Sequence, residues 1–463
     1  MSTPTPGRRS SSGGPALDTT TVLAVLLPLL TIAALLLVRP AADERPARPP
    51  ELTPLSRVLL VCPGAADGAA GEVRLSSTGQ GTRGTARLRS ETGSGRSPVR
   101  PRRASVVDGG AGPLVVAAED ALAPHLVGAR FAERPLAHAA CRPSAPEVWF
   151  TGVGAGARHS SVLELVNPDA GPALADVTTY GGGGVLDVPQ LRGVAVPGRS
   201  SVRLDLAAVV PRRGELALRV VTARGRIAAS VLDRYDALGA GPTTAEWLPG
   251  QGEPSTANTL LGLPAGSGQR MLVLTNPGED EARASLRVID EESVFTPQGT
   301  REIRVPPGSV KRVKLTGELL AVLREGALGL QVDATSPVTA TVRSLTGGDL
   351  SHAVAGPTVT ESATVLVPEG DKRLLLAGAD AVGVVTVTAW SASGKRLTRQ
   401  RTELQPGRGA DVSLPEGAVI VTVEVERSSV VASVLVAGRG VAVAPMVEQV
   451  RNGLVADVAP GLP

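Results

Sequence analysis

The sequence predicts an all-β protein in which tandem β-sandwich (immunoglobulin-like) modules follow a single N-terminal transmembrane helix. Residues 419–426 alternate between valine and intervening Ile, Thr and Glu, a period of two that places one face of a strand on a core and the other in water. Gly and Pro number 54 and 38, which indicates many turns and few long helices. Similar segments recur at about a hundred residues, the size of a β-sandwich domain.

The N-terminal part of the chain is predicted to anchor the protein. Residues 1–18 are rich in Ser, Thr, Pro and Gly and are expected to form a disordered cytoplasmic tail. Residues 19–39 are predicted to be the transmembrane helix, because Thr19 to Val38 carries no charge and matches a hydrocarbon layer of ~30 Å. A cleaved signal peptide is the alternative, but such peptides have apolar cores of roughly 7–15 residues. We therefore predict an uncleaved anchor and a Pro-rich spacer over residues 40–57.

Residues 58–146 contain both cysteines and are predicted to form an irregular β module. Two cysteines in an exported region favour a disulfide between Cys62 and Cys141 over a metal site, which needs more ligands; two unpaired thiols are the alternative. The charges on both sides of the helix do not decide its orientation. The Val-rich β region with paired cysteines favours the outside, so we predict a single-pass protein of the cell membrane with residues 40–463 extracytoplasmic.

Three further β-sandwich modules are predicted over residues 147–244, 245–358 and 359–463, the last with a C-terminal tail. The first two share an Asn-Pro turn, a Pro-Gly turn and a strand of small residues, and the third repeats this pattern more weakly. The matching pairs are residues 163–168 and 272–277, residues 196–198 and 305–308, residues 227–231 and 338–342, and residues 240–243 and 355–358.

This order of motifs resembles bacterial extracellular β-sandwich modules. Over residues 55–455 the chain resembles a family of actinobacterial exported, membrane-anchored proteins known only as a domain of unknown function. The resemblance implies an envelope or secreted location and brings no catalytic residues. The third module departs from the pattern, because Ala377-Gly378 stands where Asn-Pro is expected.

Candidate catalytic groups are sparse. The four histidines, His125, His138, His159 and His352, show no metal-ligand spacing. His159-Ser160-Ser161 could supply a base and a nucleophile, but no Gly-x-Ser-x-Gly elbow presents the serine, and a polar turn is favoured. The glycines at 152, 154 and 156 precede a strand and not the helix that a phosphate loop needs. We predict no catalytic, cofactor-binding or metal-binding residues and no cofactor.

Two acidic runs, residues 279–281 and 290–292, flank one predicted hairpin. Clustered carboxylates suit calcium, but the spaced Asp, Asn and Gly of a calcium loop are absent, so solvated turns are favoured.

Two features are candidates for interaction with partners. Trp149 and Trp247 could stack on sugars, although packing at module junctions is favoured. A basic loop could touch anionic lipid or wall polymers, with a solvated loop as the favoured reading. Its members are Arg96, Arg100, Arg102 and Arg103. The net charge of +3 gives no strong field for nucleic acid, so none is expected as a partner.

Taken together, these features predict a non-catalytic, membrane-anchored extracytoplasmic protein with a structural or protein-interaction role in the bacterial cell envelope. Its expected partners are the membrane, through residues 19–39, and other envelope proteins or wall glycans. A cell-wall polysaccharide-binding protein is the alternative, and an enzyme is the least favoured class.

Overall fold

The chain divides into two units, one comprising Met1–Thr53 with Leu454–Pro463 and the other Pro54–Gly453. In the first unit, α1 (Thr19–Leu37) is the helix. A two-stranded sheet pairs β1 (Glu51–Pro54) with β36 (Asn452–Val455). The computed structural model describes residues 19–37, 50–66, 71–133, 135–211, 213–239, 241 and 243–455. The predicted tail over residues 1–18 and most of the predicted spacer over residues 40–57 lie outside these ranges.

The predicted transmembrane helix over residues 19–39 needs correction. Helix α1 has 19 residues and contains Pro28. Within the described ranges, no helix is both long enough and apolar enough to cross a membrane. At a rise of ~1.5 Å per residue, the 19 residues of α1 reach slightly less than the ~30 Å thickness of a hydrocarbon layer.

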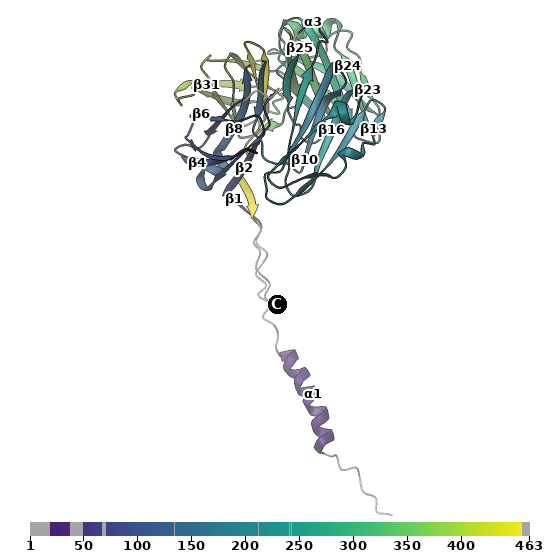
Figure 1. The fold of residues 1–463 in the computed structure, drawn as a ribbon, viewed down its shortest axis with the longest axis vertical. Coiled ribbons are helices and arrows are strands. Elements are labelled where there is room, and N and C mark those ends of the chain that lie inside the picture. Colours follow the sequence, from purple (N-terminus) through teal and green to yellow (C-terminus); the bar gives the residue numbers. More distant parts are fainter. Residues whose placement is uncertain are drawn as a thin grey trace, which may run out of the picture. The chain divides into compact units, whose positions relative to one another are not determined.

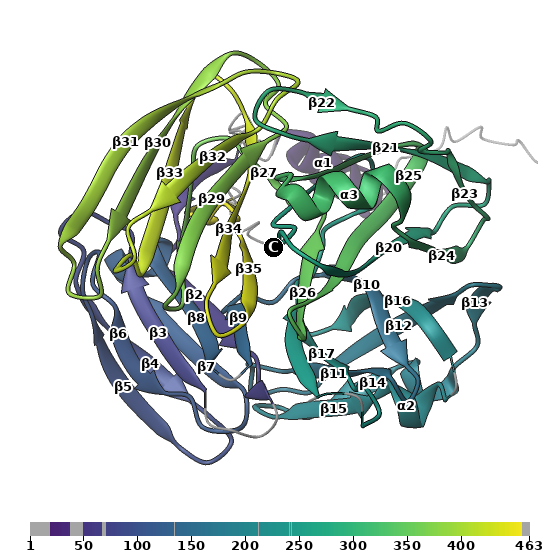
Figure 2. The ribbon, with the colours of Figure 1, turned by 90° about the horizontal axis from the view of Figure 1, so that it is seen from above.

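The second unit is a four-bladed β-propeller, so the prediction of tandem β-sandwich modules was wrong. Its strands, labelled in Figure 1, form four groups that surround a common centre in Figure 2. We number these groups blade 1 to blade 4 in chain order. The all-β class is confirmed, and the alternation at residues 419–426 corresponds to a strand of blade 4.

Blade 1 consists of two four-stranded sheets, in the orders β2-β7-β4-β5 and β6-β3-β8-β9. The predicted disulfide is confirmed: Cys62, the last residue of β2, is bonded to Cys141, which directly follows β9. The elements of blade 1 are β2 (Arg57–Cys62), β3 (Glu72–Ser77), β4 (Gly84–Arg89), β5 (Ser94–Val99), β6 (Ser105–Asp108), β7 (Leu114–Glu119), the 3-10 helix η2 (Asp120–His125), β8 (Leu126–Glu133) and β9 (Leu136–Ala140).

Blade 2 is a nine-stranded sheet with the main order β13-β12-β16-β10-β11-β17-β18, while β14 pairs with β12 and β15 with β11. Its elements are β10 (Glu147–Ala155), β11 (His159–Val166), β12 (Ala173–Gly181), β13 (Gly184–Leu186), the 3-10 helix η3 (Pro189–Leu191), β14 (Val194–Val196), β15 (Ser201–Asp205), α2 (Leu206–Val209), β16 (Arg213–Arg224), β17 (Ala228–Tyr235) and β18 (Thr244–Leu248).

Blade 3 is an eight-stranded sheet built around β25, whose first half pairs with β19 and β21 and whose second half pairs with β20 and β26. Its elements are β19 (Ser255–Leu261), β20 (Gly268–Asn276), β21 (Ala282–Ile289), β22 (Val294–Phe295), β23 (Ile303–Val305), β24 (Ser309–Lys314), α3 (Gly317–Glu325), β25 (Gly329–Thr346) and β26 (Asp349–Val354).

Blade 4 consists of a five-stranded and a four-stranded sheet. The first has the order β27-β34-β29-β32, with β35 paired to β34, and the second has the order β28-β33-β30-β31. Its strands are β27 (Thr358–Val359), β28 (Ser362–Leu366), β29 (Asp371–Ala377), β30 (Gly383–Trp390), β31 (Arg396–Leu404), β32 (Ala410–Leu414), β33 (Ile420–Glu426), β34 (Val430–Ala437) and β35 (Val441–Pro445).

The interfaces between blades explain why the modules form a ring. Each blade has its own apolar core, and separate apolar clusters join each blade to the next. One of these clusters joins blade 4 back to blade 1, with Phe131 and Val127 packed against Leu366, Trp390 and Ile420. Independent tandem modules need no contact between the first and the last. Burial of apolar surface at this closing interface stabilises the ring.

The last strand of each blade lies at the centre of the ring. These inner strands, β9, β18, β26 and β35, are neighbours in a closed cycle. Every residue of β18 and β26 is buried, as are most residues of β9 and β35. Side chains therefore fill the centre.

The repeated Asn-Pro motif has the same structural role in blades 2 and 3. The Nδ2 amide of Asn167 donates to the carbonyl oxygens of Gly171 (2.8 Å) and Val196 (3.1 Å). That of Asn276 donates to the carbonyl oxygens of Asp280 (2.7 Å) and Val305 (3.1 Å). Each amide thus links a turn to a neighbouring strand, so the repeated motif reflects a shared turn structure.

Ring closure predicts a long-range effect of a single core substitution. Phe131 is 4% exposed in the cluster between blades 4 and 1, so Phe131→Ala should cost about 3–5 kcal/mol of unfolding free energy. Hydrogen exchange, measured by mass spectrometry, should accelerate in β28 and β33 of blade 4 as well as in blade 1. Val185→Ala, at a side chain 57% exposed, should change stability by less than about 0.5 kcal/mol. Acceleration confined to blade 1 would contradict the closed ring.

Candidate functional site

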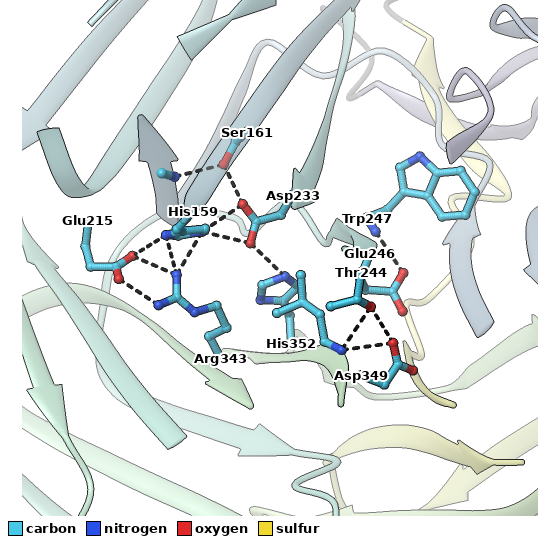
Figure 3. A network of polar contacts seen from close by, with 12 residues as sticks. His159, Ser161, Glu215, Asp233, Thr244, Glu246, Trp247, Arg343, Asp349 and His352 are labelled. Carbon is cyan, nitrogen blue, oxygen red and sulfur yellow. Dashed lines mark hydrogen bonds and ion pairs between the residues drawn. The ribbon is translucent and has the colours of Figure 1, made fainter. Parts of the chain in front are cut away.

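The most concentrated group of titratable side chains lies between blades 2 and 3 (Figure 3). His159 of β11 stands between two carboxylates: its Nε2 is 2.8 Å from Oδ1 of Asp233 on β17, and its Nδ1 is 3.0 Å from Oε2 of Glu215 on β16. The Ser161 hydroxyl donates to the same Asp233 oxygen at 2.5 Å. All four side chains come from strands of blade 2, so the sheet of this blade positions them.

Blade 3 contributes a second cation and a second imidazole to this network. Arg343 of β25 donates to Glu215 in a two-point contact, with Nη2 2.8 Å from Oε1 and Nη1 3.1 Å from Oε2. His352 of β26 has its Nε2 3.2 Å from Oδ2 of Asp233, a close contact whose geometry falls short of a hydrogen bond. The contacts between Arg343 and Glu215 and between His352 and Asp233 therefore link the two blades.

The local electrostatics fix the charge of each member. Burial and the adjacent Arg343 charge lower the pKa of His159, but the Asp233 charge and hydrogen bonds to both carboxylates outweigh them and raise this pKa to about 9. Burial raises the pKa of Asp233 and of Glu215, yet the neighbouring His159 holds both below their ordinary values. Burial keeps the pKa of His352 below its usual value. At neutral pH the cations His159 and Arg343 thus face the anions Asp233 and Glu215, beside the neutral imidazole of His352.

The contacts in this network suit a structural role and not nucleophilic attack. The Ser161 hydroxyl accepts from the Gly154 amide at 2.8 Å while it donates to Asp233, so both of its functions are used. A catalytic serine instead donates to the imidazole and faces a substrate. Ser161 and Asp233 are fully buried. Sequence reasoning had singled out His159 and Ser161 but missed Glu215, Asp233 and Arg343, which lie far from them along the chain.

A second polar network ties the inner strands together. The Asp349 carboxylate accepts from the Thr244 hydroxyl (2.6 Å) and from the Val441 amide (2.7 Å), which joins blade 3 to blades 2 and 4. The Glu246 carboxyl accepts from the His138 amide (3.1 Å), which joins blade 2 to blade 1. Burial raises the pKa of Glu246 well above its ordinary value. Thr244, Glu246 and Asp349 are drawn in Figure 3.

The two candidate tryptophans lie in interfaces between blades. Trp149 is 2% exposed beside Tyr180 in the cluster between blades 2 and 3, and its Nε1 donates to Glu147 at 2.7 Å. Trp247 is 4% exposed in a cluster between blades 1 and 2. Neither ring lies on the outer surface of the propeller, where a sugar chain could stack on it.

The basic loop lies at the junction of blades 1 and 4. The Arg102 guanidinium stacks over the Trp390 ring at 5.1 Å, and the amide of Ala104 donates to the Ala392 carbonyl at 3.0 Å. Arg96 lies on β5, and Arg96, Arg100 and Arg103 are exposed. One arginine of the loop therefore takes part in ring closure, while the other three face solvent.

The acidic runs at residues 279–281 and 290–292 do not come together with other ligands. In the described part of the chain, no three His, Cys, Asp or Glu side chains are grouped so as to hold a metal ion.

Two hollows lie between blades. A groove of about 680 Å³ between blades 2 and 3 is lined by the glycines 181–183 and by Arg213, Lys311 and Arg312. A smaller cavity of about 80 Å³ lies between blades 1 and 2, where Arg142, Trp247 and Phe150 contribute to its walls.

Fold and site thus define a closed four-bladed β-propeller with a network of buried titratable groups in the contact between blades 2 and 3. Residues 102–415, more than half of the chain, match a family of unknown function (DUF5719), and the chain belongs to this family. The expected membership of an uncharacterised family is therefore confirmed. The comparison with curated proteins gave no match.

The His159 network predicts a loss of stability at alkaline pH. Its folded pKa of about 9 lies above the ordinary ~6.5, so the stabilisation is complete below about pH 6.5 and is lost as pH rises through 9. Between pH 6 and pH 9.5, wild type should lose about 2–3 kcal/mol more unfolding free energy than His159→Gln, measured by urea denaturation.

His125→Gln is the matched control, because burial lowers the pKa of His125 and its protonation does not stabilise the fold. Its pH profile should follow that of wild type. NMR titration of the His159 imidazole provides a reading that does not depend on the variants. An imidazole that titrates below pH 7 would contradict the assigned charge state.

Proposed function

We propose that the protein is an exported, non-catalytic β-propeller with a structural or protein-binding role in the bacterial cell envelope. The observation that carries this proposal is the buried disulfide between Cys62 and Cys141, which closes a loop with a sequence separation of 79. Disulfides form and persist outside the reducing cytosol. The Ala, Gly, Arg and Val bias of the chain supports an actinobacterial source.

The use of the polar groups supports a non-catalytic role. His159 contacts both Asp233 and Glu215, and Arg343 contacts Glu215 across the interface. The hydroxyl of Ser161 is committed to Asp233. Groups held in this way stabilise the contact between blades. Glu215 also lines the groove between blades 2 and 3, but its two carboxylate oxygens are engaged by Arg343 and His159. Of the two binding roles, a protein partner is favoured over a wall glycan, because Trp149 and Trp247 are buried.

Exposed sheet edges support a protein partner. Strand β31 ends the four-stranded sheet of blade 4, and β5 ends a sheet of blade 1. Both strands carry mostly exposed or half-buried residues. An edge strand has unpaired backbone groups that a partner strand can join.

The location is tested through the state of the cysteines in living cells. Because the disulfide forms after export, Cys62 and Cys141 should resist a maleimide–polyethylene glycol reagent unless a reductant is added first. The mass shift is read on a gel. A Cys62→Ser/Cys141→Ser variant marks the gel position of the unlabelled protein. In a second experiment, protease added to cells without their outer layers should degrade the propeller. Labelling of both thiols without reductant, together with full protease protection, would refute the proposed location.

The role is tested by crosslinking in the same cells. Photocrosslinkers placed on β31 and β5 should capture a small, reproducible set of envelope proteins, while a crosslinker at the buried Leu232 should capture none. Purified wall polymer that binds saturably, with no protein captured at either edge, would favour the glycan role instead.

A further inference from the structure

The cavity between blades 1 and 2 lies beside the ends of three inner strands. Ala140 ends β9, Leu248 ends β18 and Pro445 ends β35, and all three line the cavity. Its other walls are mainly alanine, valine, proline and aromatic side chains, with Phe150 and Trp247 from blade 2. Such a hollow, apolar with few polar groups, has the character of a ligand pocket.

Arg142 is the one permanent cation among the residues that line this cavity. It exchanges two backbone hydrogen bonds with Val61, so the side chains of Arg142 and Val61 lie on the same face. Val61 belongs to the apolar cluster between blades 1 and 2. His138 lines the same cavity, and the charge of Arg142 adds to the effect of burial in lowering the pKa of this imidazole.

The Arg142 guanidinium has no hydrogen-bond or carboxylate partner among the residues that the structure describes. Burial lowers its pKa to about 10, so it stays cationic at neutral pH. The two fully buried arginines behave differently: Arg130 donates to the Gly109 carbonyl at 2.6 Å, and Arg270 donates to the Pro264 carbonyl. Arg142 is half-buried, so its guanidinium has lost part of its hydration without gaining a protein partner, and an anionic ligand would supply that partner.

Trp247 offers a second donor to the same space. Its indole N–H makes no hydrogen bond to any described residue, although the ring lines the cavity and is only 4% exposed. In Figure 3 the indole extends away from the Glu246 carboxyl. A guanidinium and an N–H in an apolar hollow suit a carboxylate, which accepts several hydrogen bonds at once.

We propose that this cavity binds the carboxylate end of an aliphatic ligand, with Arg142 as the anion-binding residue. A volume of about 80 Å³ is about half of the ~150 Å³ that holds a benzene ring, so only a small group enters beside the carboxylate. The C-terminal residue of a peptide ending in alanine fits this description. A carboxylated sugar fits poorly, because its buried hydroxyls would lack partners. This site goes beyond the proposed envelope role and does not depend on it.

The test is a titration of the purified full-length protein at constant ionic strength. N-acetylalanine, butyrate and glucuronate are compared by tryptophan fluorescence and thermal unfolding. N-acetylalanine or butyrate should bind saturably and raise the melting temperature, whereas glucuronate should not. Preference for N-acetylalanine assigns a peptide terminus as the source, preference for butyrate assigns an acyl chain, and both support the site.

Arg142→Met separates binding from folding. It should weaken N-acetylalanine binding about 10- to 100-fold, as expected for the loss of a charge-assisted contact. Because it removes an unpaired cation, its melting temperature without ligand should equal or exceed that of wild type. Arg103→Met, at an exposed arginine, should bind as wild type does. Equal binding by Arg142→Met, tightest binding by glucuronate, or no saturable binding of any probe would overturn the proposal.

Discussion

The contact between blade 4 and blade 1 is the constraint on which the rest of the fold depends. Phe131 of blade 1 meets Leu366, Trp390 and Ile420 of blade 4, and this apolar contact closes the ring. Without it, the outer faces of the first and last blades would be exposed to water, and the inner strands β9 and β35 would no longer be neighbours. Closure lets four modest cores act as one structure, since each blade then has an apolar interface on both sides.

The interfaces differ in chemistry. Apolar side chains dominate the contacts from blade 3 to blade 4 and from blade 4 to blade 1. Between blades 2 and 3, by contrast, Trp149 and Tyr180 pack next to the charged network of His159, Glu215 and Arg343. Asp233 supplies the second anion that balances these charges, so their burial is compatible with a stable contact. Their fixed geometry defines how the two blades dock.

Local patterns in the sequence predicted local structure. The alternation at residues 419–426 became a strand, the Asn-Pro repeat became the same clamp at Asn167 and Asn276, and the two cysteines formed the expected disulfide. Closure of the ring was not predictable, because an interface strand shows the same alternation as a half-exposed one. Ile420 lies on the face opposite the alternating valines, among Thr and Glu, yet it is 2% exposed against blade 1. The His159 network was equally hidden, since its partners meet only after two blades have docked.

The uneven distribution of charge gives the ring a preferred place to open. Breaking an apolar interface costs much the same free energy over a wide range of pH, whereas the seam between blades 2 and 3 weakens once His159 loses its proton. Alkaline stress would therefore open the ring between blades 2 and 3 first and leave the disulfide-linked blade 1 attached to blades 2 and 4. A ring opened there presents two complementary surfaces, which another opened copy could join by exchanging halves.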